Sequence, residues 1–135
     1  MIKVTRTTPL PSMGSVDVGI AQGFKKGGIV TVRDLKRSLT TGSRSGRIYR
    51  IGGRTHQASA AGEAPAKITG ALADSAGYEV GNKMLTIGEG AKYAAYLENG
   101  TGHMAARPHL KPAVERNAAQ IGLLIGQNVL KRMIK

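Results

Sequence analysis

The stretch YLENGTGHMAARPHLKPAVE (96–115) gathers the residues of this sequence that are best suited to chemistry. Glu98, His103 and His109 combine a carboxylate with two imidazoles, and both groups are common zinc ligands. Their spacings of five and six residues do not give the i, i+4 histidine pair of a zinc-protease helix. The chain also has no cysteine that could complete the set. We therefore predict no metal site and interpret the histidines as ordinary surface groups.

A catalytic triad could be assembled on paper from Ser59 or Ser75, His56 or His103, and Asp74 or Glu98. No serine lies in a nucleophile-elbow pattern such as G-x-S-x-G, and these residue types occur by chance in any chain of this length. The glycines at 52–53 and 88–90 are not followed by the G-K-[ST] of a phosphate-binding loop. We predict that the protein is not an enzyme and that it uses no cofactor.

Two long segments have the apolar spacing of amphipathic helices. In the first, the apolar residues are Val16, Ile20, Phe24, Val32, Leu35 and Leu39. Their steps of three and four predict a helix that ends near Gly42. The pair Gly27-Gly28 costs about 1 kcal/mol per glycine in a helix, so we predict a break or kink there.

The second amphipathic segment is at the C-terminal end, with apolar residues Leu110, Val114, Ala118, Ile121, Ile125, Val129 and Met133. Pro112 lacks an amide donor and favours a helix start at 110–112. Gly122 and Gly126 have the spacing that lets another helix approach closely; simple tolerance of glycine explains them equally well.

The residues between these helices read as a long loop and a small sheet. The glycine-rich segment 42–62 predicts a loop, in which residues 47–51 alternate weakly like a strand. Residues 72–80 and 83–87 are expected to pair as a hairpin around Gly81-Asn82. We predict an α+β fold, with an extended N-terminal arm over residues 1–14 and a single domain over residues 15–135.

Charge is the clearest compositional signal, with 20 Lys and Arg against 8 Asp and Glu, a net charge of +12 over 135 residues. Four arginines of the predicted loop, Arg44, Arg47, Arg50 and Arg54, contribute to a basic region with a single acid, Asp34, between residues 21 and 56. Such a region attracts polyanions, either nucleic acid or an acidic protein. No segment approaches the roughly 20 apolar residues that span a bilayer, so we expect no membrane contact.

Two blocks, HQASAAGEAPAKITGALADS (56–75) and YAAYLENGTGHMAARPHLKPAVE (93–115), resemble the tail-completion, or neck, family of long-tailed bacteriophages. The family's pattern is roughly Ala-Pro-x-x-Thr-Gly-x-Leu-x-x-Ser, then Tyr-Ala-x-Tyr-x-Glu-x-Gly-Thr, then Ala-Arg-Pro-x-Leu-x-Pro-Ala before a final helix. This chain has three residues between Pro65 and Thr69. The blocks cover about a third of the chain. His109 departs from the pattern, because the family usually has an aromatic residue after Arg-Pro.

The resemblance implies a non-enzymatic structural virion protein that forms a homo-oligomeric ring, six- or twelve-fold, at the head–tail junction. Its partners would be neighbouring neck, portal-side and tail-tube or tail-terminator proteins, in the host cytoplasm during assembly and then in the virion. The matching positions are candidates for assembly or for shaping the elbow before the last helix: Thr69, Gly70, Tyr93, Glu98, Gly100, Thr101, Arg107, Pro108 and Pro112. We expect Gly100 and Gly102 to adopt backbone conformations that a Cβ would disfavour.

Two further questions stay open from the sequence. The four arginines could contact double-stranded DNA in the channel without reading bases, or an acidic neighbouring protein. The alternative function is a basic nucleic-acid-binding module that acts in packaging or regulation.

Overall fold

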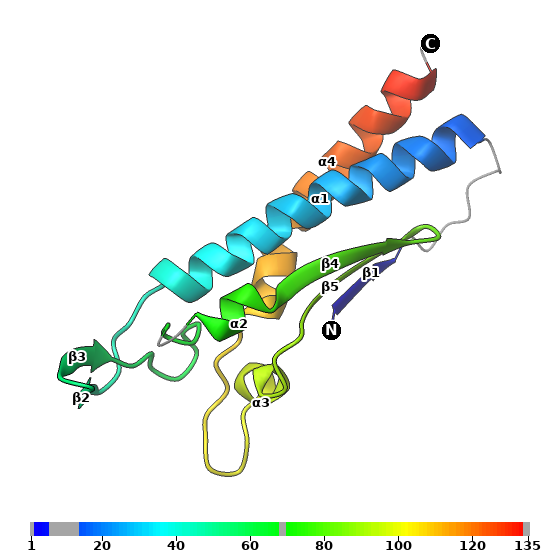
Figure 1. Cartoon of the computed structure of the whole chain (residues 1–135). Helices are drawn as coiled ribbons and strands as arrows, with labels where there is room; N and C mark the ends of the chain where they lie inside the picture. Colours follow the sequence, from blue (N-terminus) through cyan, green and yellow to red (C-terminus); the bar gives the residue numbers. More distant parts are fainter. Residues whose placement is uncertain (1, 6–13, 68–69, 134–135) are drawn as a thin grey trace.

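The computed structural model describes residues 2–5, 14–67 and 70–133, and its fold is α+β, as predicted (Figure 1). In chain order the elements are β1 (Ile2–Thr5), α1 (Gly14–Thr41), β2 (Ile48–Ile51), β3 (Arg54–Gln57), α2 (Ala71–Asp74), β4 (Ala76–Gly81), β5 (Met84–Glu89), α3 (Ala94–Asn99) and α4 (Leu110–Met133). The long helices α1 and α4 lie side by side and antiparallel, and the three-stranded sheet covers one side of α1 (Figure 1).

Glycines of α1 let the two long helices approach to backbone contact. They are Gly19, Gly23 and Gly27, which face Val129, Ile125 and Ile121 of α4 in turn. A Cβ at Gly23 would lie only 2.4 Å from Cα of Ile125. Glycines four residues apart therefore make the close helix contact in α1. In α4, where the sequence pointed to Gly122 and Gly126, a Cβ at either position would meet nothing within 4 Å.

Of the break or kink predicted at Gly27-Gly28, the break is wrong, because α1 is continuous from Gly14 to Thr41. Both glycines are needed for packing. A Cβ at Gly28 would lie 2.4 Å from the ring of Tyr78 on β4, so this glycine admits the sheet while Gly27 admits α4. These contacts offset the low helix propensity of glycine. The helix ends one residue before Gly42, as predicted.

The main sheet is antiparallel with the strand order β1–β5–β4. The predicted hairpin is confirmed, with β4 and β5 joined through residues 82 and 83. Its first part is different, because residues 71–74 form the helical turn α2, which buries both Leu72 and Ala73. Residues 2–5 of the predicted arm form β1 and pair with β5, and residues 6–13 lie outside the described part of the chain.

The basic segment 42–62 is not simply a loop, because it contains the hairpin β2–β3, which forms a second sheet. The strand over residues 48–51 is confirmed, and β3 was missed. Gly52 and Gly53 connect the strands with φ angles of 54° and 79°. A two-residue hairpin turn requires two successive positive φ angles. The two glycines, which were predicted to be loop residues, therefore form the turn of the hairpin.

The hydrophobic core lies between α1, α4 and the sheet. Its largest fully buried apolar side chains are Phe24, Ile20, Leu35, Leu85 and Ile87. In α4 the buried positions include Leu110, Val114 and Ile121, as the predicted stripe requires, but Ala118 and Met133 are exposed. Within the described ranges, no helix has both the length and the apolar character to cross a membrane.

Candidate functional site

The candidate site is the elbow, residues 100–109, which connects α3 to α4 and was singled out by its sequence pattern. Its tip is closed by Thr101 and Met104, whose backbones form an isolated β-bridge. Its base is fixed by the Arg107 amide, which donates to the carbonyl of Leu97 over 2.7 Å. Gly100 has a φ of 75°, and a Cβ there would lie 2.7 Å from the Ala106 amide nitrogen, so glycine is required. Gly102 has neither constraint, and that expectation is wrong.

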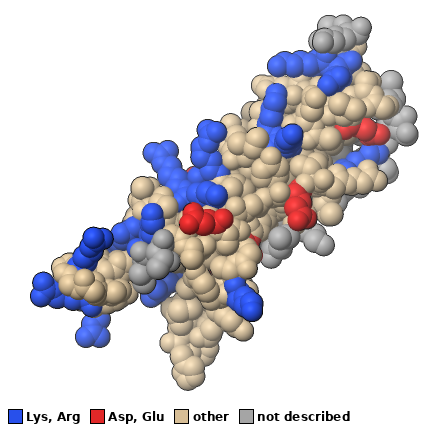
Figure 2. Space-filling view, viewed as in Figure 1, with Lys and Arg blue, Asp and Glu red and all other residues tan. Residues whose placement is uncertain are grey.

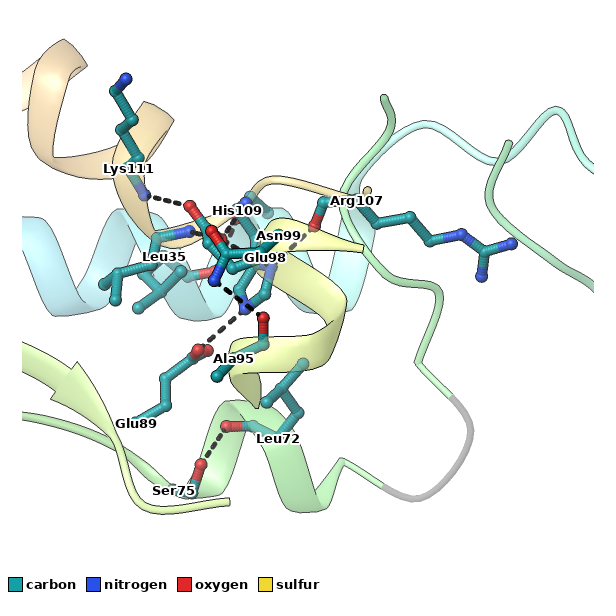
Figure 3. A network of polar contacts seen from close by, with 12 residues as sticks. Leu35, Leu72, Ser75, Glu89, Ala95, Glu98, Asn99, Arg107, His109 and Lys111 are labelled. Carbon is teal, nitrogen blue, oxygen red and sulfur yellow. Dashed lines mark hydrogen bonds and ion pairs between the residues drawn. The ribbon is translucent and has the colours of Figure 1, made fainter. Parts of the chain in front are cut away.

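Glu98 of α3 holds the start of α4 with one carboxylate (Figure 3). It accepts hydrogen bonds from the amides of His109, Leu110 and Lys111, over 2.8, 3.0 and 2.9 Å. The first amides of a helix have no partner within the helix, and a negative charge at this end also complements the helix dipole. Glu98 therefore functions as the cap of α4, although it lies more than ten residues before the helix.

His109 is not the surface group that was predicted, because it is 1% exposed. Its Nδ1 lies 2.9 Å from the carbonyl oxygen of Arg107, and its Nε2 lies 2.8 Å from Oε2 of Glu89 at the end of β5. Both ring nitrogens face acceptor atoms, an arrangement that suits the two N–H donors of a protonated imidazolium. His109 thereby connects the elbow to the sheet, in place of the aromatic residue expected there.

The pKa values of this cluster follow from its contacts. Burial alone would lower the pKa of His109, but the hydrogen bonds to Glu89 and the Arg107 carbonyl, with the charges of Glu89 and Glu98, raise it above 6.5. Partial burial alone would raise the pKa of Glu98, but its three amide bonds and the nearby His109 lower it below 4.5. The network is thus built as a buried cation between two carboxylates.

The other described candidates of the elbow set lie at or just before the starts of α2, α3 and α4. Pro108 and Pro112 are half-buried, and Pro112 lies in the first turn of α4, which begins at Leu110 as expected. Gly70 precedes α2 with a φ of 92°. Tyr93 directly precedes α3 and is 45% exposed. Thr69 lies outside the described residues.

The four arginines do not form one group. Arg44 donates from Nη2 to the carbonyl of Thr40 over 2.8 Å and so covers the end of α1. Arg47, Arg50 and Arg54 are exposed on the β2–β3 hairpin or beside it, and none of the ion pairs among the described residues includes them. The basic side chains at this end of the molecule are visible in Figure 2.

The side chains of the hypothetical triad are not assembled. His56 lies on β3, where its ring contacts Tyr49 edge-on at 5.2 Å, and His103 is exposed at the tip of the elbow. Ser75 donates to the carbonyl of Leu72, and the buried Ser59 hydroxyl has no partner within the described part of the chain. Among those residues, no group of three or more His, Asp or Glu is arranged to hold a metal ion.

Comparison with known proteins gives no match. No family model, curated protein or solved structure is similar enough to place the chain in a family. The likeness to the neck proteins therefore remains a prediction from the two sequence blocks.

Two residues that sequence reasoning missed are essential to this arrangement. Glu89 comes from the sheet, and only the fold brings it to His109. Glu63 accepts from the amide and hydroxyl of Ser45 and from the amide of Ala60, so it ties the base of the hairpin to the following loop. The hydrogen bond from the Ser45 hydroxyl, followed by those from the two amides, lowers the pKa of Glu63. Glu63 thus positions backbone, whereas Glu89 positions the ring of His109.

Proposed function

We propose that the protein is a non-enzymatic structural component of the head–tail junction of a long-tailed bacteriophage and that it assembles into a homo-oligomeric ring. The proposal joins the sequence likeness to one surface of the structure, the outer face of α4.

The residues that carry the likeness have a coherent structural use. The motif Tyr-x-Glu-x-Gly-Thr supplies the Glu98 carboxylate and the Gly100 turn, and Arg-Pro-x-Leu-x-Pro supplies the carbonyl of Arg107 and the start of α4. The motif thus fixes the direction of the last helix. Such rigidity favours repeated docking between identical copies, because a preorganised surface loses little entropy on association.

The observation that carries the proposal is a second apolar stripe on α4, opposite the one in the core. It consists of Ala119, Gly122, Leu123, Gly126, Leu130 and Met133, all exposed, at steps of three and four. Leu123, Leu130 and Met133 are 66%, 58% and 61% exposed. From Asn117 to Leu130 the helix has no charged residue, although the chain has a net charge of +12.

This stripe is better suited to contact with a second copy of the chain than to exposure to solvent. Two molecules with a charge of +12 repel one another, and the uncharged face of α4 is where that repulsion is smallest. An apolar helix face left without a partner is also a common mark of an association surface. Gly122 and Gly126 leave the backbone open between the leucines, which lets a partner helix approach closely.

Mass determination of the purified protein in its native state tests the proposal. We expect a closed oligomer, alone or with its neighbouring virion proteins, and a ring in electron micrographs. A protein that stays monomeric in both settings, at concentrations up to about 1 mM, would contradict it.

A second function is favoured by the exposed hairpin arginines, namely a basic nucleic-acid-binding module of packaging or regulation. It would bind free duplex DNA as a monomer or dimer, whereas the ring assembles through protein contacts. Titration with duplex DNA over a salt series separates the two. If Arg47, Arg50 and Arg54 each contact a phosphate, replacing all three with glutamine reduces the log–log salt slope by roughly 3. A flat slope excludes phosphate contact.

A further inference from the structure

A cavity of about 380 Å³ lies between the β2–β3 hairpin, the α2 turn and the elbow. Its walls are mainly apolar, with Leu39, Leu72, Leu97 and Pro65 among them. Its polar side chains are Tyr49, His56, Ser59, Lys67, Tyr93 and Arg107. Cations and hydroxyl groups thus line the cavity, and none of the lining residues is acidic.

Two of these polar groups are buried without a hydrogen-bond partner among the described residues. They are the hydroxyl of Ser59, a residue that is 2% exposed, and Nε of Arg107. In Figure 3 the Arg107 side chain extends away from the Glu98–His109 network, and no contact is drawn to its guanidinium. Buried donors without acceptors are uncommon in folded proteins, because each costs desolvation free energy. Both residues line the cavity, so an acceptor bound there is a candidate partner for each.

Both donors are held by rigid backbone. The Arg107 amide donates to Leu97 and its carbonyl accepts from His109, so only the side chain is free to meet a ligand. Behind Ser59, the Ala58 amide donates to the carbonyl of Arg47, and a Cβ at Gly46 would lie 2.6 Å from the Ser59 carbonyl oxygen. A preorganised pair of donors in an apolar cavity is the usual construction of a specific binding site.

We infer that this cavity receives an acidic segment of a neighbouring protein, with a glutamate or aspartate carboxylate against Arg107 and Ser59 and an adjacent apolar side chain against the leucines. The inference deepens the proposed function, on which it rests for the identity of the neighbour. A guanidinium binds a carboxylate through charge-assisted hydrogen bonds, and Lys67 adds positive charge at the rim. Duplex DNA fits this site less well, because its phosphates lie on a broad convex surface that cannot enter a cavity with apolar walls.

Fluorescence polarisation with defined peptides tests the inference. The probes are three short capped peptides with one glutamate between two leucines, two phenylalanines or two tyrosines, and three twins with glutamine in place of glutamate. We expect at least one glutamate peptide to bind roughly tenfold more tightly than its twin, since a charge-assisted bond contributes more than a neutral one. Arg107→Gln should remove that preference, and Ser59→Ala should weaken it.

Arg50→Gln is the matched control, because it removes the same charge from the exposed hairpin and not from the cavity. It should change the affinity less than about twofold, the size of a screened surface effect. The inference is overturned if no glutamate peptide is preferred, if Arg50→Gln weakens binding as much as Arg107→Gln, or if a short DNA duplex or free 3-phenylpropionate displaces the peptide at equal concentration.

The same samples keep this inference separate from the proposed ring. The native mass of Arg107→Gln is measured beside that of the wild type. A ring that shows no preference for a glutamate peptide would refute the inferred binding in the cavity and leave the proposed ring intact. A protein that stays monomeric and prefers the glutamate peptide would refute the proposed ring and support the inferred binding in the cavity.

Discussion

His109 Nε2 lies 2.8 Å from Oε2 of Glu89, and their side chains are 0% and 2% exposed. This contact joins the first residue before α4 to the last residue of β5. It is therefore the point at which the elbow is fixed to the sheet, and the first two predictions concern it and its neighbour Glu98.

The first prediction concerns stability and pH. Because folding raises the pKa of His109, the folded state retains a proton that the unfolded state loses near pH 6.5. The contribution of His109 to the free energy of unfolding is complete below that pH and is lost as the pH rises through the folded-state pKa. Denaturant titrations between pH 6 and 9 should show this fall for the wild type and not for His109→Gln.

His103→Gln is the control for this prediction, since His103 is exposed at the elbow tip and makes no side-chain contact with the Glu89 cluster. Its pH profile should follow that of the wild type. Equal alkaline slopes for wild type and His109→Gln would show that His109 is not a cation in the folded state.

The second prediction concerns Glu98 as the cap of α4. Glu98→Ala leaves the amides of His109, Leu110 and Lys111 without their acceptor, so it should lower the free energy of unfolding by about 2 kcal/mol, the upper end for a lost cap. The lowered pKa of Glu98 also gives the direction of the pH dependence. The contribution of Glu98 to the free energy of unfolding is present above the unfolded-state pKa of 4.5 and is lost as the pH falls through the folded-state pKa.

Glu115 provides a matched control on the same helix. Its carboxylate is 63% exposed and lies 3.9 Å from Nζ of Lys111. Glu115→Ala should change the free energy of unfolding by less than about 0.5 kcal/mol, as exposed pairs do. Equal losses for the two variants in urea titrations would remove Glu98 from its role as the cap.

The third prediction uses opposite responses of two glycines to the same substitution. Gly23→Ala places a methyl group 2.4 Å from the Ile125 Cα, a backbone atom that cannot move alone, so we expect a loss of about 2–3 kcal/mol or more. Gly122→Ala meets nothing within 4 Å and should gain about 0.5–1 kcal/mol from helix propensity. Thermal unfolding of both variants, at concentrations at which the protein is monomeric, measures the contrast. A loss of stability at Gly122 in the monomer would contradict the open space beside it.

The sequence pattern was sufficient to predict an element where its apolar residues recur regularly and its contacts are close in sequence. The end of α1, the start of α4 and the turn of the β4–β5 hairpin were predicted within about two residues, since steps of three and four and a short glycine-containing turn are local signals. The start of β4 was predicted four residues too early, because residues 71–74 form α2. The continuity of α1 was not predicted, because propensity counts glycine only as a cost. The repeat Gly19-x-x-x-Gly23-x-x-x-Gly27 was present in the sequence and marks the close contact with α4.

The site was harder to predict because its contacts are long-range. Glu98 and the elbow were recognised, but the burial of His109 depends on Glu89, which lies twenty residues earlier on a strand. The cavity is formed by segments from α1 to the elbow, so no spacing in the sequence reveals it. A usable signal was the two consecutive glycines at 52–53, which identify the hairpin that forms one of its walls.

The fourth prediction concerns the outer stripe of α4. Leu123→Gln combined with Leu130→Gln removes two exposed anchors without touching the core, so the melting temperature should stay within about 2 °C of the wild type, because exposed substitutions cost little. Assembly should weaken roughly a hundredfold, since full burial of a leucine side chain contributes at least about 1.5 kcal/mol, or roughly tenfold for each. Sedimentation over a concentration series measures the shift.

The absence of cysteine from the chain gives this prediction a direct second test. Gly126→Cys introduces a single thiol on the stripe, where a Cβ has open space. A maleimide attached to this thiol places a bulky group on the outer face of α4, so it should block assembly as the leucine-to-glutamine changes do. Arg33→Cys, at an exposed position of α1, is the control, and its labelled form should assemble like the wild type. Equal assembly of the two labelled proteins would remove the outer face of α4 from the assembly contact, because a bulky group on the apolar stripe should prevent a second copy from docking there.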